Sequence, residues 1–311
     1  MITVTINGRA LEAQPGMTIM EVADKNGIYI PRLCYHKALS PIGACRICVV
    51  EVKPGPPRPV PACTTPVTDK MEVTTESERL THYRRELLQL LLINHPLDCP
   101  ICDKGGECEL QNLTRALKIK EQPYKAARLT PRYDAQSPLI ERYPDRCVNC
   151  ERCVRVCRDR VGAAALYFDN RGYRTAVTAG GPVMDCEFCG SCIGVCPVGA
   201  IIDKTFKYSA RAWQLEKDTA VCPYCGGGCH LVLNLKNGRL KRVTTSFQEP
   251  VNGGIICSRG RFGLNIVQEE TRLKEPLIRK DGRLTPGSWD EALHFAAERL
   301  RGLLSQFGPR A

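Results

Sequence analysis

Apolar and polar positions alternate over residues 2–6 and again over 10–13, which is the pattern of half-buried strands. Asn7-Gly8 separates the two runs, and this dipeptide favours a two-residue hairpin turn. Thr18 is followed three residues later by Glu21, the pattern of a capping box that starts a helix. The start of the chain therefore predicts a hairpin followed directly by a short helix.

Two more strands are expected over residues 47–52 and 71–74, with a proline-rich loop over 54–61 between them. Together with the hairpin, they predict a half-open sheet packed on one helix. Residues 77–94 then place leucines along one side of a longer helix, which ends just before His95.

Beyond that helix the pattern changes several times. A polar stretch interrupted by three prolines, up to residue 143, predicts a linker that covers neighbouring modules. Residues 206–215 predict a connecting helix, and residues 230–244 predict a hairpin around Asn237-Gly238. A second capping box at Ser288 opens an amphipathic helix through Leu304, with an apolar stripe and no obvious partner in the chain.

The composition indicates bound metal, because 19 cysteines accompany only 43% hydrophobic and 6% aromatic residues. This balance suits small loop-rich modules built around inorganic centres. The chain starts as a strand rather than a signal segment, which makes disulfides improbable and a cytoplasmic location the expectation. The longest apolar run, residues 87–93, is far shorter than the roughly 18 residues that span a bilayer, so no direct membrane insertion is expected.

All 19 cysteines fall into five groups with none left over, once one histidine joins the second group. The candidate metal ligands are Cys34, Cys45, Cys48 and Cys63; His95, Cys99, Cys102 and Cys108; Cys147, Cys150, Cys153 and Cys157; Cys186, Cys189, Cys192 and Cys196; and Cys222, Cys225, Cys229 and Cys257. No catalytic residue is assigned, since no dinucleotide-binding glycine signature or nucleophile pattern accompanies them.

The first group suits a 2Fe-2S cluster, in which a tight loop offers backbone N–H groups to the sulfurs and a distant cysteine closes the site. Its first gap is wider than that of plant-type ferredoxins, and a zinc site is the alternative. The second group has three cysteines, so His95 is expected to supply the fourth bond to a 4Fe-4S cluster. An imidazole leaves that cluster less negative than a thiolate would.

The next two groups have the same spacing of two, two and three residues between cysteines, which is the strongest signal in the chain. In such pairs the fourth cysteine of each run binds the other cluster, because the local loop presents only three thiolates well. Cys196 is therefore expected with the first run and Cys157 with the second. Arg158 follows Cys157 where a proline is usual. The fifth group, with its Gly226-Gly227-Gly228 run, suits a further 4Fe-4S cluster, with a zinc ribbon as the alternative.

The formal charge of +11 would by itself suit nucleic-acid binding. Five thiolate-bound clusters would contribute about nine negative charges and leave about +2. The charge therefore gives no reason to expect a nucleic-acid partner.

Taken together, the motifs resemble the large iron-sulfur subunit of NADH:quinone oxidoreductase, its G subunit. They also resemble the N-terminal part of NAD-linked formate dehydrogenase alpha subunits and the corresponding subunit of multimeric hydrogenases. The most specific part is the segment over residues 92–99 together with Lys104-Gly105-Gly106. The resemblance implies an electron-transfer subunit of an NAD(P)H-linked complex, with a flavin/NAD-binding subunit and a small 2Fe-2S subunit as partners. A hydrogenase, formate dehydrogenase or other terminal redox subunit would complete the complex, which could attach peripherally to the inner face of a membrane.

The expected fold is α+β and multi-domain. The domains are a β-grasp 2Fe-2S domain over 1–78, a helical His-Cys domain over 79–120, a linker over 121–143, a two-cluster ferredoxin-like domain over 144–206, a small β-rich 4Fe-4S domain of the molybdopterin oxidoreductase type over 218–274, and a truncated helical tail over 275–311.

Two departures from the family bear on function. Both cysteine runs of the paired module are complete, which favours formate dehydrogenase or hydrogenase complexes over respiratory ones. Only a short tail follows Cys257, and Arg259 stands where pterin relatives carry Lys, so substrate chemistry is expected in another polypeptide. The alternatives left open are an N-terminal fragment of a molybdopterin-dependent formate dehydrogenase and a zinc scaffold.

Overall fold

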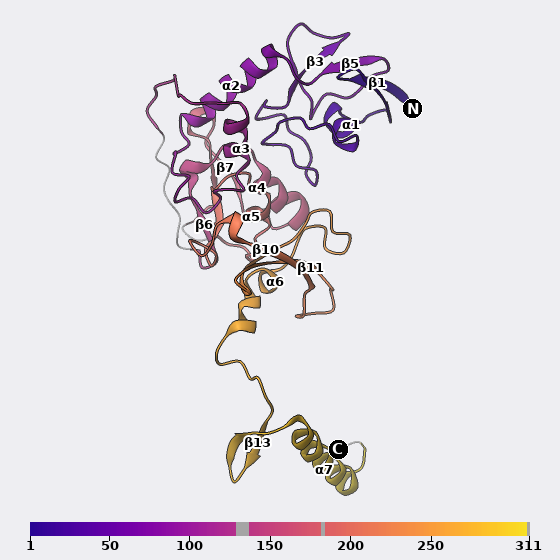
Figure 1. Ribbon diagram of the computed structural model, residues 1–311, viewed down its shortest axis with the longest axis vertical. Helices are drawn as coiled ribbons and strands as arrows, with labels where there is room; N and C mark the ends of the chain where they lie inside the picture. The colour runs from indigo at the N-terminus through magenta and orange to yellow at the C-terminus, as the bar shows by residue number, and fades with distance from the viewer. Residues whose placement is uncertain (129–136, 182–183, 310–311) are drawn as a thin grey trace. The chain divides into compact units, whose positions relative to one another are not determined.

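The computed structural model describes residues 1–128, 137–181 and 184–309. It divides into two compact units, residues 1–264 and 265–311 (Figure 1). Within the described residues, no helix has the length and apolar character needed to cross a membrane.

The N-terminal module is a mixed five-stranded sheet with one short helix. Its elements are β1 (Ile2–Ile6), β2 (Arg9–Ala13), α1 (Ile19–Lys25), β3 (Val49–Lys53), β4 (Val60–Pro61) and β5 (Met71–Thr74). The strand order is β2-β1-β5-β3-β4, in which β1 and β5 are parallel and the other pairs antiparallel. The predicted hairpin is confirmed, with Asn7 and Gly8 at positive φ, and so is the capping box at Thr18. The apolar faces of sheet and helix form one core that also contains Cys48 and Cys63.

Helix α2 (Glu78–Leu92) confirms the long leucine helix, and its N-cap Ser77 accepts a hydrogen bond from the backbone N–H of Leu80. Helix α3 (Glu109–Ala116) begins directly after Cys108. Leu88 and Leu92 of α2 and Leu110 and Leu113 of α3 belong to a core that also contains cysteines of the central modules.

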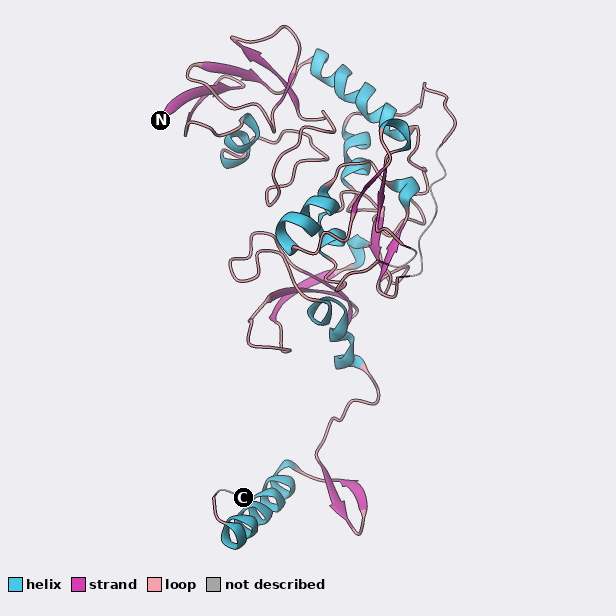
Figure 2. Cartoon of the chain, turned by 180° about the vertical axis from the view of Figure 1, so that it is seen from behind, coloured by secondary structure: helices cyan, strands magenta, loops and turns pink. Residues whose placement is uncertain are grey.

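The central modules are mostly loops between short elements (Figure 2). These are β6 (Ile140–Arg142), the 3-10 turn η1 (Pro144–Arg146), α4 (Arg152–Arg155), the π-helical segment η2 (Val156–Val161), β7 (Tyr167–Asp169), the 3-10 turn η3 (Gly172–Arg174), β8 (Ala176–Thr178), α5 (Ser191–Val195) and β9 (Ile201–Asp203). Strand β6 pairs antiparallel with β9, and β7 pairs with β8. Part of the predicted linker, residues 129–136, lies outside the described residues, and its last part forms β6, which the sequence pattern did not indicate.

The connecting helix expected over 206–215 is wrong, since only the 3-10 turn η4 (Ala212–Gln214) forms there. Tyr208 has a positive φ, and its backbone N–H donates to the carboxylate of Asp103. The Arg211 guanidinium donates to the backbone carbonyls of Cys102 and Pro100. Ser209, Gln214 and Leu215 donate to carbonyls three residues earlier. The segment is therefore a series of turns that Tyr208 and Arg211 connect to the cysteine loop of the second group.

A three-stranded antiparallel sheet follows, made of β10 (Glu216–Val221), β11 (His230–Lys236) and β12 (Arg239–Thr244). It confirms the hairpin around Asn237-Gly238. The helix α6 (Ser258–Phe262) and the 3-10 segment η5 (Gly263–Gln268) follow the sheet in the chain. The second unit consists of the hairpin β13 (Leu277–Lys280) and β14 (Arg283–Pro286) with α7 (Trp289–Phe307). The capping box at Ser288 is present, and α7 has no buried residue.

Candidate metal centres

The first group lies where the loops of the N-terminal sheet meet. Cys34, Cys48 and Cys63 are 0–1% exposed, and Cys45 is half-buried. The backbone N–H of Cys34 donates to the Cys45 sulfur at 3.4 Å, and that of Cys45 donates to the Cys34 sulfur at 3.5 Å. Such amide contacts fit sulfur atoms that carry negative charge.

The thiols of this group cannot all ionise by themselves. Hydrogen bonds from the thiols of Cys45 and Cys63 lower the pKa of Cys34 to about 2. The same hydrogen bonds raise the pKa of both donors, because their protons are held between two sulfurs. The hydrogen bond from Cys63 also lowers the pKa of Cys48. Two of the four thiols are therefore acidic, and a bound cation would release the other two protons.

In the second group, His95 is 8% exposed and fixed in one tautomer. Its Nδ1 lies 3.0 Å from the backbone carbonyl oxygen of Arg146. A carbonyl only accepts, so Nδ1 carries the proton and Nε2 keeps a free lone pair. Burial also lowers the pKa of His95, which favours the neutral imidazole that a metal requires.

The cysteines of this group are held by close backbone packing. Cys102 and Cys108 are buried, and burial raises the pKa of both, that of Cys108 to about 11. A Cβ added to Gly199, which follows the last cysteine of the neighbouring module, would lie 2.4 Å from the Cys102 sulfur. The space beside this thiol therefore depends on a glycine in another module.

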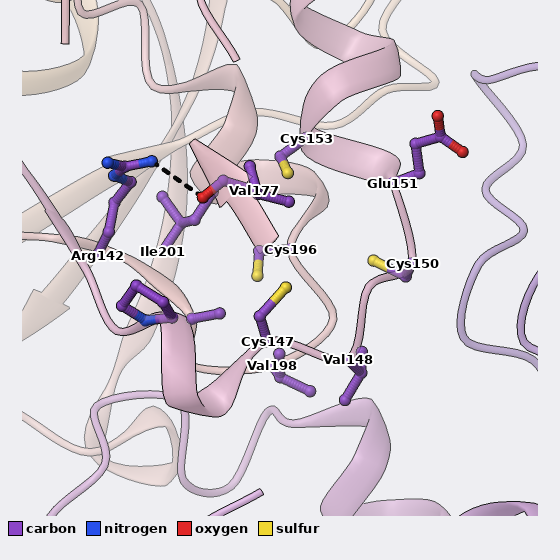
Figure 3. Close-up of a pocket in the computed structure, with 12 residues that line it drawn as sticks. Arg142, Cys147, Val148, Cys150, Glu151, Cys153, Val177, Cys196, Val198 and Ile201 are labelled. Carbon is purple, nitrogen blue, oxygen red and sulfur yellow. Dashed lines mark hydrogen bonds between the residues drawn. The ribbon is translucent and has the colours of Figure 1, made fainter. Parts of the chain in front are cut away.

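Three thiols of the third group and one thiol of the fourth group line a single cavity, as expected if the fourth cysteine of each run binds the other cluster. Cys147, Cys150 and Cys153 line it together with Cys196 from the other run, and Val148, Val177, Val198 and Ile201 supply apolar walls (Figure 3). The four sulfur atoms point toward one common space, while Cys157 is not among the lining residues. Burial, aided by the neighbouring thiols, raises the pKa of Cys147 to about 12 and also raises the pKa values of Cys150 and Cys153.

The fourth group mirrors the third. Burial raises the pKa of Cys192, and the nearby thiols of Cys189, Cys157 and Cys186 add to this effect. The backbone N–H of Phe188 donates to the Cys186 sulfur at 3.4 Å, just as that of Asn149 donates to the Cys147 sulfur at 3.4 Å.

The two loops also share their backbone conformation. Asn149 and Phe188 occupy equivalent positions with φ of 48° and 51°, and Glu151 and Gly190 follow with φ of 63° and 69°. The equal spacing thus reflects one folded loop used twice, each ending in a short helix that carries its fourth cysteine away from the local three.

The fifth group is more open. Cys222 is buried and Cys229 half-buried, while Cys225 and Cys257 are exposed. Burial raises the pKa of Cys229, and the nearby thiols of Cys222, Cys225 and Cys257 add to this effect. A glycine also lies against a sulfur here, since a Cβ added to Gly260 would be 3.5 Å from the Cys222 sulfur.

In the part of the chain that the structure describes, no three His, Cys, Asp or Glu side chains are placed to hold a single ion. Thiols spaced around a cavity, contacted by backbone N–H groups and enclosed by apolar side chains, fit a larger inorganic cluster.

The structure also shows a set of residues that sequence reasoning missed. Six arginines are buried among the described residues: Arg84, Arg142, Arg146, Arg152, Arg155 and Arg261. Arg146 pairs with Asp98, and Arg152 pairs with Glu109 at 2.6 Å. Arg261, on α6, donates through Nε to the backbone carbonyl of Cys189 at 2.8 Å, which links the fifth group to the fourth. Arg152 and Arg155 lie between the cysteines of the third group, but the same run contains the exposed Arg158 and Arg160, so the sequence alone did not single out the buried pair.

Fold and sites together define a multi-centre iron-sulfur protein, and four family models match consecutive parts of the chain. They describe a 2Fe-2S iron-sulfur cluster binding domain (residues 1–78), an NADH-ubiquinone oxidoreductase-G iron-sulfur binding region (84–123), a ferredoxin-like domain of NADH-quinone oxidoreductase subunit 3 (137–202) and a molybdopterin oxidoreductase Fe4S4 domain (215–269). The chain therefore contains domains of both the 2Fe-2S and the 4Fe-4S kind.

Individual relatives agree with these matches. The NADH-quinone oxidoreductase G subunit 2 of Rhizobium meliloti is 44% identical over 96% of this chain and 35% of its own length. The NADPH-Fe(3+) oxidoreductase subunit alpha of Geobacter sulfurreducens is 42% identical over 100% of this chain and 36% of its own length. A chain in the crystal structure of NAD+-reducing [NiFe]-hydrogenase in the H2-reduced state superposes with a TM-score of 0.63 and 31% identity, over 67% of this chain and 90% of that chain.

The chain belongs to the family of NADH-quinone oxidoreductase G subunits and related iron-sulfur subunits. It spans only 35% and 36% of the length of the two curated relatives just described. The activities of those full-length relatives can therefore only be proposed for this chain.

Proposed function

We propose that this chain is the electron-transfer subunit of a multi-subunit NAD(P)H-linked oxidoreductase. The observation that carries the proposal is the convergence of thiols from both cysteine runs on one apolar-walled cavity, in the exchanged pairing typical of two-cluster ferredoxins. Relatives named as NADH-quinone and NADPH-Fe(3+) oxidoreductase subunits support the link to a nicotinamide nucleotide.

The proposed cofactors are one 2Fe-2S cluster in the first group and one 4Fe-4S cluster in each of the other four. Their ligands are the 19 cysteines with His95, and Cys157 and Cys196 exchange between the third and fourth groups. The proposed domain limits are 1–78, 79–120, 144–206 and 218–274, with 275–311 as a separate helical tail.

Bound clusters would supply the electron acceptance and donation. The chain itself contributes four things: it positions the ligands, it donates backbone N–H groups to the sulfurs, it excludes water with apolar walls, and it keeps His95 neutral. No residue is proposed to make or break a bond in a substrate.

The proposed partners are a flavin/NAD-binding subunit, a small 2Fe-2S subunit, and a terminal redox subunit of hydrogenase, formate dehydrogenase or another kind. The proposed location is the cytoplasm, with membrane attachment only through partners. Neither a nucleic-acid partner nor a membrane-inserted segment is part of the proposal.

A reductive titration of the anaerobically purified full chain tests this function. The chain should accept about five electrons, one per cluster, with paramagnetic signals of both cluster types. A colourless chain that accepts no electrons and contains stoichiometric zinc would contradict the proposal.

A second candidate is that the chain is part of a molybdopterin-dependent formate dehydrogenase polypeptide. The match of residues 215–269 to a molybdopterin oxidoreductase Fe4S4 domain favours it. Isolation of the native complex decides between the two, because a pterin bound to the polypeptide that contains this chain supports the second candidate. A pterin on a separate subunit, or none, supports the first.

A further inference from the structure

Arg155 lies between the first and third groups of thiols. It is the last residue of α4, which carries Cys153 of the third group. Its Nη2 donates to the backbone carbonyl of Cys34 at 2.6 Å and to that of Cys150 at 3.2 Å, and its Nη1 donates to that of Ser40. One guanidinium therefore contacts a candidate ligand residue of each group.

The charge of this side chain has no protein counter-ion in an ion pair among the described residues. Arg155 is 1% exposed, and its Nε has no hydrogen-bond partner. Three residues earlier, Arg152 is equally buried but pairs with Glu109. The hydrogen bonds of Arg155 all go to carbonyl oxygens, and burial of an unpaired cation is unfavourable unless an anion lies close by.

The anions that fit are the two clusters on either side. A thiolate-bound cluster carries net negative charge, and the contacts of Arg155 lead to one ligand residue of each site. A role as a purely mechanical link between modules would explain the three carbonyl contacts, but it would not require a permanent charge without an acidic partner.

We propose that Arg155 is a positioning residue whose charge raises the reduction potentials of two clusters, the one at Cys34, Cys45, Cys48 and Cys63 and the one at Cys147, Cys150, Cys153 and Cys196. This inference rests on the proposed function. Each cluster becomes more negative by one charge when it takes up an electron, and a nearby cation in a low-dielectric site stabilises that form. Because the guanidinium contacts a ligand residue of each site, its charge raises both potentials in the same direction.

The test is a potentiometric titration of the full chain followed by electron paramagnetic resonance. Three variants are compared with the unchanged chain: Arg155→Gln, Arg155→Lys and Arg158→Gln. Arg158 is the matched control, because its side chain is 58% exposed and pairs locally with Asp159. A Cys150→Ser variant identifies the signal of the third group.

Arg155→Gln should shift the ratio of reduced to oxidised form at least tenfold toward the oxidised form in both clusters, a change of about 59 mV in each midpoint. Arg155→Lys retains the charge and should shift the ratio less than threefold. Arg158→Gln should leave both midpoints unchanged. None of the three arginine variants should change the midpoints of the remaining clusters.

Unchanged midpoints in a loaded Arg155→Gln variant would overturn the inference, as would equal shifts in the Gln and Lys variants. If the Gln variant does not take up clusters, the Lys variant decides. Wild-type midpoints in the Lys variant support the electrostatic role, and shifted midpoints or absent clusters assign Arg155 to the fold alone. If the unchanged chain itself lacks clusters, the proposed function fails rather than this inference.

Discussion

His95 is the one candidate ligand that is not a thiol, and its chemistry can be tested by exchange. His95→Cys should lower the reduction potential of the second cluster, because a thiolate ligand makes it more negative by about one charge. The reduced-to-oxidised ratio of that cluster should fall at least tenfold at a fixed potential, with the other signals unchanged. Redox titration with paramagnetic detection measures this effect. His82→Cys is the control, since His82 is exposed on α2, and an unchanged potential in His95→Cys would remove the histidine from the ligand set.

Gly199 gives a second test at the scale of one atom. Gly199→Ala would place a methyl group 2.4 Å from the Cys102 sulfur, so the thiol must move. The variant should lose about four irons per chain, the content of one 4Fe-4S cluster, as measured by iron analysis after anaerobic purification. Gly226→Ala is the matched control, because nothing lies within 4 Å of the added carbon there. Full iron content in Gly199→Ala would show that the second site is not placed as described.

At the scale of elements, the two cysteine loops offer a matched comparison. Gly190 and Glu151 precede α5 and α4 at equivalent positions with similar positive φ. Gly190→Ala adds a residue that disfavours this conformation by about 1–2 kcal/mol, and its Cβ would lie 2.2 Å from Arg261 Cδ. The free energy of unfolding of the loaded chain should fall by at least about 1 kcal/mol, as measured by denaturant titration.

Glu151→Ala should change that free energy by less than about 0.5 kcal/mol, because the position already carries a Cβ. Equal effects of the two substitutions would contradict the placement of Arg261 against the fourth loop.

The elements also show how much of the structure the sequence could predict. The N-terminal hairpin, the capping boxes and the leucine helix depend on local rules, and all were predicted. The segment over 206–215 was predicted as a helix and is not one, because Tyr208 has a positive φ and the segment bonds to Asp103 and Cys102 through the Tyr208 N–H and the Arg211 side chain. Local patterns contain no information about such long-range partners. The same reason hid the arginines, since neither the burial of Arg155 nor its contact with Cys34 follows from its neighbours in sequence.

At the scale of the whole molecule, the proposed electron-transfer function requires five sites that hold iron and sulfide. The cysteine spacing predicted the five groups, and the structure brings Cys196 to the cavity of the other run. Iron and acid-labile sulfide analysis of the anaerobically purified full chain tests this claim most directly. The account predicts about 18 of each per chain, whereas zinc in place of iron, or iron without sulfide, would contradict it.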